Sequence, residues 1–203
     1  MNYTESLAYL DSLGKFGIKL GMERIEGLLR ELGNPEQKIK TVHVTGTNGK
    51  GSVTSMITNI LLAANLKVGK FTSPHLVKYN ERINLNGKDI NDEDFATAIT
   101  AVKVAADSVV KKGVCEQPTQ FEILTAAAFL YFYLQKVDYA VIEVGMGGLW
   151  DSTNVITPVV SVITNVALDH TDRCGKTLER IAMQKAGIIK EKVPLVTAAE
   201  GNE

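Results

Sequence analysis

The sequence has 203 residues, of which 45% are apolar and 22% are charged, and its formal net charge is −1. This composition is ordinary for a globular chain with a sizeable core. The near-neutral charge argues against a nucleic-acid-binding protein, which usually carries a basic surplus. The longest apolar run, Ile123 to Leu134, is too short to cross a bilayer and so argues against a membrane protein.

The N-terminus and the cysteines are those expected of a cytoplasmic protein. The first residues, Met1 to Glu5, lack the basic and apolar regions of a signal peptide. Cys115 and Cys174 are far apart in the chain and do not have the spacing of a metal site. We therefore expect both cysteines to be reduced thiols, as is usual in the cytosol.

Periodicity and turn residues divide the chain into alternating helices and strands. Helical spacing and capping residues predict helices over residues 3–13, 22–32, 53–64, 92–112, 119–135 and 177–186. Apolar and β-branched runs predict strands over residues 41–44, 68–72, 139–144, 159–164 and 193–198. This alternation predicts an α/β fold in which helices cover both faces of a mostly parallel sheet.

Two stretches between these elements are predicted to be a loop and a turn. Residues 73–83 show no clean periodicity, and long ordered loops in compact domains are usually functional. Asn86-Gly87 has the composition of a tight hairpin turn. The region after the second strand is therefore a candidate for ligand contact.

A glycine-rich turn separates the first predicted strand from the helix that is expected to begin at Val53. Its residues are Gly46, Thr47, Asn48, Gly49, Lys50, Gly51 and Ser52. A strand, a glycine turn and a helix form the geometry that aims backbone amides at a phosphate, and a lysine can neutralise the phosphate charge. The turn therefore predicts a nucleotide-binding site.

The turn matches the usual phosphate-loop pattern only in part. Val44 occupies the place of the first glycine of that pattern, and Gly51 separates Lys50 from Ser52. Ser52 still lies where its hydroxyl could reach a magnesium ion. A glycine-rich turn with an exposed lysine and no ligand is the structural alternative.

Polar residues with unusual chemistry lie at the ends of the other predicted strands, where ligands of open α/β sheets bind. Glu143 lies in a central apolar strand, and burying a carboxylate is costly unless it is paired or holds a metal. Magnesium is the natural partner behind a phosphate loop. His170 follows the fourth strand, and Asp169 could orient its ring. A solvent-facing glutamate and a surface histidine are the alternatives.

Several further candidates have an equally simple structural interpretation. The segment Ser73-Pro74-His75 could be only a turn. Phe121 could be a core residue or a platform for an aromatic substrate. Glu81 and Arg82 could form a surface ion pair or contact the substrate. Lys185 would by default be a solvated helix lysine.

Taken together, these residues resemble the Mur ligase superfamily, and most closely its folylpolyglutamate synthase/dihydrofolate synthase family. The motifs that carry the resemblance are His43 to Ser52, Phe71 to Leu76 with Glu81 to Ile83, Glu143 to Gly148, Asp151 to Ile156, Leu168 to His170 and Lys185 to Lys190. The resemblance covers essentially the whole chain. Several motifs in the right order are more specific than a phosphate loop alone.

The resemblance implies a P-loop-containing three-layer sandwich of the Mur ligase central-domain type, here truncated. Residues 1–203 would be an N-terminal ATP-binding domain, itself incomplete, without the C-terminal glutamate-binding domain. The implied activity is ATP-dependent ligation of glutamate to a folate or dihydropteroate carboxylate through an acyl phosphate. ATP and Mg²⁺ would be the cofactors, and no nucleic-acid or membrane partner is implied. The full-length enzyme would be a monomer, and this chain alone would be inactive.

The resemblance also implies roles for individual residues. The glycine turn would hold the ATP phosphates. The residues implied in catalysis are Lys50, Glu143, His170 and Lys185. The implied metal ligands are Ser73, Glu143, His170 and Lys185, the last as a carbamate. The implied substrate contacts are Ser73, Pro74, His75, Arg82 and Phe121.

Three departures from the family pattern leave these ligands in place. Leu149-Trp150 stands where the family often has Arg-Leu, Arg173-Cys174 precedes Gly175 where leucine is commoner, and Gln184 replaces a frequent glutamate. The first departure puts any substrate contact from that loop in doubt. Another Mur-type amide ligase and a non-catalytic nucleotide-binding module are the alternative functions.

Overall fold

The computed structural model describes residues 1–14, 21–168 and 177–199. Its strands are β1 (Thr41–Thr45), β2 (Val68–Phe71), β3 (Ile83–Leu85), β4 (Lys88–Asp89), β5 (Tyr139–Glu143), β6 (Val160–Ile163) and β7 (Leu195–Thr197). Its α-helices are α1 (Tyr3–Leu13), α2 (Glu23–Glu31), α3 (Lys50–Ala63), α4 (Asp92–Lys111), α5 (Gln120–Leu134) and α6 (Leu178–Ala186). Short 3₁₀ helices are η2 (Pro35–Lys38), η3 (Tyr79–Arg82) and η4 (Ser152–Val155).

The strands form one seven-stranded sheet in the order β4-β3-β2-β5-β1-β6-β7. Strands β2, β5, β1, β6 and β7 run parallel, whereas β3 and β4 form an antiparallel hairpin at one edge. The β1–β5 register places Val44 opposite Glu143. The strand that leads into the glycine turn is therefore the direct neighbour of the strand that carries the buried glutamate.

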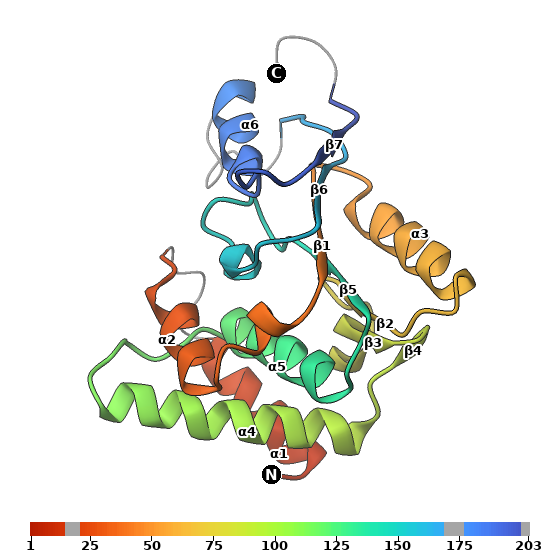
Figure 1. Ribbon diagram of the computed structural model, residues 1–203. Helices are drawn as coiled ribbons and strands as arrows, with labels where there is room; N and C mark the ends of the chain where they lie inside the picture. The colour runs from red at the N-terminus through yellow and green to blue at the C-terminus, as the bar shows by residue number, and fades with distance from the viewer. Residues whose placement is uncertain (15–20, 169–176, 200–203) are drawn as a thin grey trace.

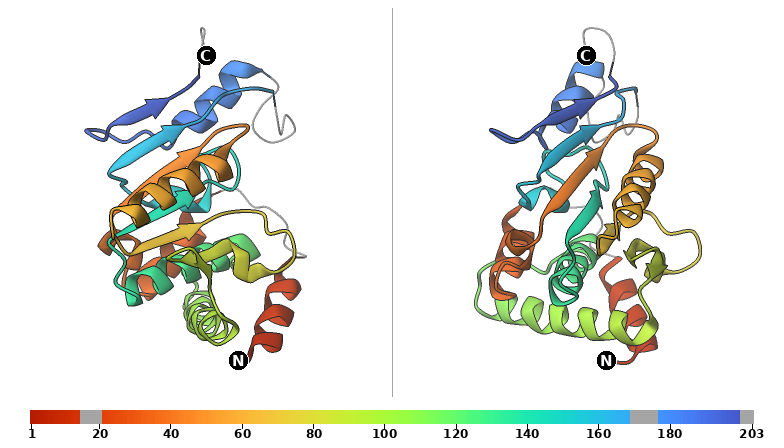
Figure 2. Two further views of the ribbon diagram at one scale, coloured as in Figure 1. Left: turned by 90° about the vertical axis from the view of Figure 1, so that its right-hand side faces the viewer. Right: turned by 45° about the vertical axis from the view of Figure 1, so that its right-hand side comes forward.

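Helices cover both faces of the sheet, as the sequence predicts. Figure 1 shows α3 on one face and α2, α5 and α6 on the other, with α1 and α4 outside α5. The turned views in Figure 2 show the same separation, with α3 in front of the sheet and α6 behind it. The α/β three-layer fold with a mostly parallel sheet is thus confirmed.

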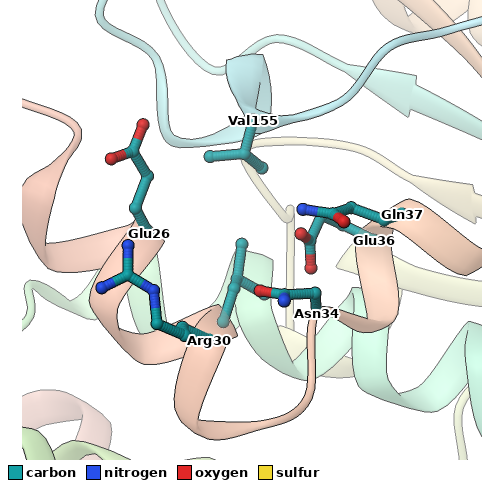
Figure 3. Close-up of a pocket in the computed structure, with 7 residues that line it drawn as sticks. Glu26, Arg30, Asn34, Glu36, Gln37 and Val155 are labelled. Atoms are coloured by element: carbon teal, nitrogen blue, oxygen red, sulfur yellow. The ribbon is translucent and has the colours of Figure 1, made fainter.

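A cavity of about 250 Å³ opens on the α2 face of the sheet. It lies between α2, η2 and η4, and Figure 3 shows the side chains that line it. The residue before η2, Asn34, has a left-handed backbone, so the chain turns sharply between α2 and η2. This turn leaves room between the two elements.

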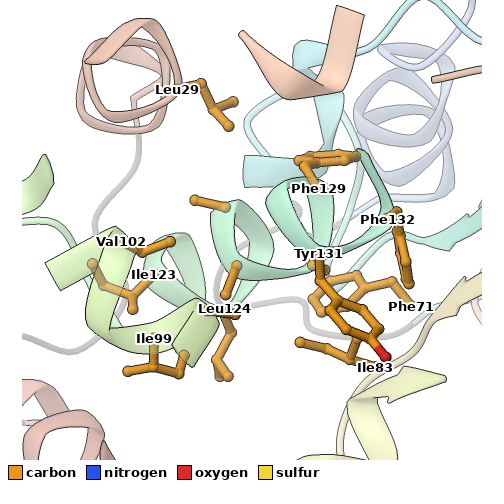
Figure 4. Packing of buried hydrophobic residues seen from close by; sticks show 14 of the residues in the cluster. Leu29, Phe71, Ile83, Ile99, Val102, Ile123, Leu124, Phe129, Tyr131 and Phe132 are labelled. Carbon is orange, nitrogen blue, oxygen red and sulfur yellow. The ribbon is translucent and has the colours of Figure 1, made fainter. Parts of the chain in front are cut away.

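The main hydrophobic core lies between the sheet and α5. Helix α5 is buried on most of its surface, which explains why its sequence is mostly apolar. Figure 4 shows its aromatic side chains packing with Phe71 of β2 and with residues of α4. Gly69 permits this contact, because a side chain at that position would overlap the ring of Phe132. A smaller cluster lies under α3 and includes Val42, Val44, Val68 and Val141.

The predicted elements are confirmed within about three residues, but the short strands β3 and β4 and the 3₁₀ helices were not predicted. The region over residues 73–83 is not all loop, because it ends in η3 and enters β3. The predicted turn is confirmed, since Asn86 and Gly87 both have positive φ and connect β3 to β4. Three-residue and two-residue strands are too short for their periodicity to be visible in the sequence.

Helix α3 begins earlier than predicted and buries a mixed polar and apolar face. The helix begins at Lys50 rather than Val53, and its buried face is centred on Thr54 and Thr58. Val53, Ile57 and Leu61 pack against the cluster under α3, whereas Met56 and Ile60 are 63% and 69% exposed. The Thr58 hydroxyl donates to the Thr54 carbonyl at 2.8 Å, so it is satisfied, whereas the buried Thr54 hydroxyl has no hydrogen-bond partner.

The last strand, β7, lies at the edge of the sheet. All three of its residues are exposed, including Leu195 and Val196. In the part of the chain that the structure describes, no helix is long and apolar enough to span a membrane.

Candidate functional site

The glycine turn lies at the carboxyl end of β1 and leads directly into α3. Gly49 occupies the N-cap position with a left-handed φ of 78°, and no side chain caps the first turn of the helix. The first backbone amides of an uncapped helix can donate to an external anion. Asn48, Gly49 and Ser52 are exposed, so this end of the helix is accessible.

Residues that follow β6 hold the glycine turn in place. The Asn165 side-chain oxygen accepts a hydrogen bond from the Asn48 amide at 2.9 Å, and the Thr164 hydroxyl donates to the Asn48 carbonyl at 2.6 Å. The Thr47 hydroxyl is buried and donates to the Ala167 carbonyl at 3.1 Å. Gly46 has a φ of 155°, and a side chain there would collide with Thr164. The turn is therefore a preformed structure.

Lys50 is half-buried rather than solvent-facing. Its Nζ donates to the carbonyls of Gly46 and Thr47 at 2.9 Å and 3.1 Å. The ammonium group thus lies across the turn, where the phosphates of a nucleotide would approach. This position favours a phosphate-binding loop over the alternative, a glycine-rich turn that has an exposed lysine and no ligand.

Glu143 ends β5 beside the glycine turn and is only 4% exposed. Its Oε2 accepts a 3.2 Å hydrogen bond from the backbone amide of Ser73, which follows β2. A side chain at Gly51 would lie 3.7 Å from the same oxygen. Burial raises the pKa of Glu143, while the Ser73 amide and the charges of Lys50 and Lys70 oppose the shift. The alternative of a solvent-facing glutamate is therefore wrong.

The loop after β5 is anchored by a buried network that the sequence did not reveal. The Asp151 carboxylate accepts hydrogen bonds from the Met146 amide at 2.9 Å and from the Thr153 amide and hydroxyl at 3.0 Å and 2.6 Å. His43 Nε2 lies 2.8 Å from the same Thr153 hydroxyl. The Thr45 hydroxyl donates to the Gly147 carbonyl at 2.7 Å. These bonds fix the 145–151 loop against β1.

Burial shifts the pKa values of Asp151 and His43, the two titratable residues of this network, in opposite directions. Burial raises the pKa of Asp151, and hydrogen bonds from Thr153 and from the backbone of the loop oppose that rise. Burial, aided by the charge of Lys190, lowers the pKa of His43 to about 3. The sequence Asp151-Ser152-Thr153 is typical of a helix cap, and this was the only sign of the network in the sequence. The partner of His43 could not be predicted, because Thr153 is far away in the chain.

The loop from Ser73 to Arg82 is ordered by its own polar contacts. The Glu81 carboxylate accepts hydrogen bonds from the backbone amides of Leu76, Val77 and Lys78, each at 2.8 Å. Arg82 Nε donates to His75 Nδ1 at 2.9 Å. The alternative of a Glu81–Arg82 surface ion pair is therefore wrong, because each side chain has a different partner. Pro74 is exposed, and His75 is half-buried against the Tyr79 ring at 4.4 Å.

Phe121 lies at the edge of the core, beside the end of β5. Its half-buried ring packs against Phe71, with 6.0 Å between the ring centroids. The same ring lies against Gly145, where an added side chain would be 2.6 Å from Phe121 Cζ and 3.1 Å from Asp151 Oδ2. Phe121 is thus part of the core edge and also borders the end of β5.

Lys185 is buried, being only 4% exposed, so its default interpretation as a solvated lysine is wrong. It lies in the last turn of α6, against the loop that follows β5. The Leu149 amide donates to the Gln184 carbonyl at 2.8 Å, and a side chain at Gly148 would meet the Lys185 carbonyl at 3.1 Å. The Leu149-Trp150 loop therefore packs on α6, and Trp150 is 48% exposed.

Not every predicted ligand can be placed. Asp169, His170, Arg173 and Cys174 lie outside the described residues. Within residues 1–14, 21–168 and 177–199, no group of three or more His, Cys, Asp or Glu side chains could hold a metal. The structure does bring the glycine turn, the Ser73 amide and Glu143 together at the carboxyl ends of β1, β2 and β5. The chemistry of this group is that of an anion site beside a buried carboxylate.

Comparison with known proteins gives a consistent result. The family model of the Mur ligase middle domain matches residues 44–199. The dihydrofolate synthase/folylpolyglutamate synthase of Bacillus subtilis (strain 168) is 46% identical over 97% of this chain and 46% of its own length. The apo form of L. casei FPGS superposes with a TM-score of 0.93 at 46% identity, over 98% of this chain and 49% of that one.

A third similar structure contains ligands. It is an FPGS complex with AMPPCP and folate, with a TM-score of 0.90 and 47% identity, covering 97% of this chain and 48% of that chain. The chain therefore spans about half the length of these three relatives.

Proposed function

The chain belongs to the Mur ligase middle domain family, and on this basis we propose that it is the ATP-binding part of a ligase that joins glutamate to a folate or dihydropteroate carboxylate. The names of its relatives and the AMPPCP–folate complex of a similar structure support this proposal. The observation that carries it is the buried Glu143 carboxylate beside the preformed glycine turn. A glycine turn beside a buried carboxylate is suited to bind a nucleotide whose phosphates carry a bound cation.

The proposed reaction has two steps. The acceptor carboxylate attacks the γ-phosphorus of ATP, which forms an acyl phosphate and releases ADP. The amine of glutamate then attacks the acyl carbon, and the tetrahedral intermediate loses phosphate and a proton to give the amide. Lys50 and the first amides of α3 would hold the transferring phosphate and offset its charge, because catalysis of phosphoryl transfer is mostly positioning and electrostatics.

We propose that Ser73 and Glu143 hold Mg²⁺ together with the nucleotide. Hydroxyl and carboxylate oxygens are donors that Mg²⁺ prefers; Glu143 adjoins Gly51 of the glycine turn, and Ser73 contacts Glu143. The raised pKa of the buried Glu143 carboxylate supports the fit, because a nearby cation would compensate its charge. When bound, the ion would neutralise phosphate charge. His170 is proposed as a further ligand.

Lys185 is proposed to carry a carbamate that provides oxygen donors for a second Mg²⁺. Its burial at the end of α6, against the loop that follows β5, supports this assignment. A carbamate would convert a cation into the oxygen-donor anion that a hard metal requires. A ¹³C-bicarbonate NMR signal that disappears in Lys185→Gln tests the assignment, and its persistence in that variant would contradict it.

The acceptor is proposed to bind along the Ser73–Arg82 loop and Phe121. Phe121 offers an apolar ring face beside Gly145, and the Arg82–His75 pair offers a cation for a carboxylate. Ser73 and Pro74 would border the same space. These contacts would bring the acceptor near the glycine turn, since Ser73 already touches Glu143.

We propose that residues 1–203 provide the ATP-binding unit and that further sequence provides the glutamate site. The relatives' greater length supports this division. Amide formation requires that the amine and the acyl phosphate be held together. We therefore expect this chain to bind nucleotide without releasing ADP in response to glutamate, and the complete enzyme to act as a monomer.

The test is a titration of the 203-residue chain with AMPPCP and Mg²⁺, followed by a panel of acceptors. We expect saturable AMPPCP binding, and then binding of dihydropteroate or reduced folate but not of a muramyl peptide. Preference for the muramyl peptide would identify another Mur-type ligase. A chain extended to the length of its relatives should release ADP only with glutamate and a folate acceptor. Nucleotide binding without that release would identify a non-catalytic module.

A further inference from the structure

The cavity on the α2 face lies away from the glycine turn and is not used by the proposed reaction. It is lined by Glu26, Leu29, Arg30, Asn34, Glu36, Gln37 and Val155. Helix η2 immediately precedes β1, so this cavity lies toward the amino end of that strand, whereas the glycine turn follows its carboxyl end. A ligand in the cavity would therefore be separate from a nucleotide at Lys50.

Glu36 is the unusual residue of this cavity. It is only 4% exposed, and its Oε2 atom is buried without a hydrogen-bond partner. Burial raises the pKa of Glu36, although its own backbone amide, Gln37 and Lys38 oppose the shift. A buried carboxylate oxygen without a donor is costly, and natural proteins seldom leave one uncompensated. A hydrogen-bond donor that enters the cavity could bind either oxygen of Glu36, because both oxygens share the negative charge. Such a donor would reduce the free-energy cost of burying the carboxylate.

The charged and polar side chains of the cavity come from two elements on opposite sides of it. Figure 3 shows Glu26 and Arg30 on one side, extending from α2, and Glu36 and Gln37 on the other, from η2. Glu26 and Arg30 are exposed and form the rim, whereas Glu36 is buried. The cavity thus offers a carboxylate for a cation and a guanidinium for an anion. A guanidinium group such as that of Arg30 is planar and can donate two parallel hydrogen bonds to one carboxylate.

The apolar part of the lining is small. Leu29 and Val155 are its hydrophobic residues. The volume of about 250 Å³ is below the roughly 300–1,000 Å³ typical of pockets for drug-sized ligands. Size therefore favours a small polar molecule over a nucleotide or a pterin, and the two carboxylates disfavour a phosphate. A divalent metal is also disfavoured, because no group of three acidic, His or Cys side chains is found among the described residues.

We propose that this cavity binds a small zwitterionic amino acid, with its ammonium group at Glu36 and its carboxylate at Arg30. The amide groups of Asn34 and Gln37 complete the polar contacts, and Leu29 and Val155 accommodate the side chain or Cα. The site is independent of the proposed ligase activity. Occupancy would link α2 to η2 and so to the start of β1.

The test is an NMR titration of the ¹⁵N-labelled 203-residue chain with glycine, L-alanine and L-glutamate. We expect saturable shifts of the side-chain amide signals of Asn34 and Gln37 with at least one of them. Acetate and n-butylammonium each carry only one of the two charges, so each should bind about tenfold more weakly or worse. AMPPCP binding is measured in the same samples, so a failed nucleotide site and a failed cavity site are distinguishable.

Two variants and one control complete the test. Glu36→Gln keeps the side-chain shape and removes the charge, and Arg30→Gln changes an exposed residue; each should weaken binding about tenfold or more. Glu23→Gln, also on α2 but outside the lining, should not change the affinity. If Glu36→Gln does not fold, Arg30→Gln decides. The proposal is overturned by absent shifts at tens of millimolar amino acid, by shifts confined to the glycine turn, by n-butylammonium binding equally well, or by unchanged affinity in Arg30→Gln.

Discussion

The backbone amide of Ser73 donates a 3.2 Å hydrogen bond to Oε2 of Glu143. This contact joins the ends of β2 and β5, which are neighbours in the sheet. Because β1 lies on the other side of β5, the same carboxylate also faces Gly51 in the first turn of α3. One buried charge therefore lies where the proposed nucleotide, metal and acceptor contacts meet.

The charge of Glu143 should reduce stability in the absence of ligand. Its folded-state pKa is raised above 4.5, so the folded chain keeps a proton that the unfolded chain has lost. The free energy of unfolding should therefore fall as the pH rises from about 4.5 through the folded-state pKa. Glu143→Gln carries no titrating carboxyl group, so it should lack this loss of stability and be more stable than the parent at pH values above that window.

Chemical denaturation across pH 4–8, with and without Mg²⁺ and AMPPCP, measures both effects of Glu143. The parent should gain stability from the ligands, and Glu143→Gln should gain much less. Equal gains in both proteins would show that Glu143 does not contribute to the metal–nucleotide site.

Lys50→Ala should weaken AMPPCP binding at least tenfold, roughly the effect of losing one charged contact. The chain should stay folded, with a loss of about 1 kcal/mol, because Lys50 makes two hydrogen bonds within the turn but is not a core residue. Lys111→Ala, an exposed lysine at the end of α4, is the matched control and should change neither property. Unchanged affinity in Lys50→Ala would contradict the phosphate-loop assignment.

The sequence predicted the parts of the fold and site that depend on local patterns. The glycine turn between a β-branched strand and a helix was recognisable because backbone geometry there requires glycine. Glu143 stood out because a carboxylate in an apolar strand is rare. The apolar spacing of α3 does not by itself show that Met56 and Ile60 are exposed, because the buried face of this helix also contains Thr54 and Thr58.

Contacts between distant segments could not be predicted in the same way. His43 and Thr153 are 110 positions apart, and their contact depends on the packing of η4 against β1. A surface ion pair with Arg82 was one of two alternatives for Glu81, yet its carboxylate accepts from three backbone amides that precede η3. The burial of Lys185 likewise depends on how the 145–149 loop meets α6.

Gly46→Ala should disrupt the glycine turn. Gly46 has a φ of 155°, and an added Cβ would collide with the Thr164 hydroxyl that holds the turn. We expect a loss of roughly 2 kcal/mol or more and at least tenfold weaker AMPPCP binding. Gly14→Ala is the control, because Gly14 has helical dihedrals and open space around its Cα. A Gly46→Ala variant with parental stability would contradict the described turn.

Glu81→Ala should loosen the Ser73–Arg82 loop without unfolding the sheet. The amides of Leu76, Val77 and Lys78 would lose their common acceptor and should exchange with solvent much faster. Glu93→Ala, on the exposed first turn of α4, is the control. Hydrogen exchange measured by NMR tests this prediction, and unchanged protection of the three amides in Glu81→Ala would refute it.

His43 should remain neutral throughout the physiological pH range. The Thr153 hydroxyl donates to Asp151, so His43 Nε2 must carry the proton that it donates to Thr153. His43 Nδ1 is then a buried acceptor without a partner, and protonating it would bury a charge. This is the physical reason for the pKa of about 3.

The lowered pKa of His43 predicts how the free energy of unfolding changes with pH. The unfolded chain binds a proton near pH 6.5 and the folded chain only near pH 3, so this residue should reduce the free energy of unfolding as the pH falls below 6.5. Asp151 acts in the opposite sense, because its pKa is raised and its protonation favours the folded state. The contribution of His43 is therefore obtained from the difference between the parent and His43→Gln, whose amide can still donate to Thr153. That difference should shrink by about 1.4 kcal/mol for each pH unit below 6.5, as the parent loses stability that the variant retains. An NMR titration of the His43 ring with a midpoint near 6.5, or a difference that does not change with pH, would refute the buried neutral histidine.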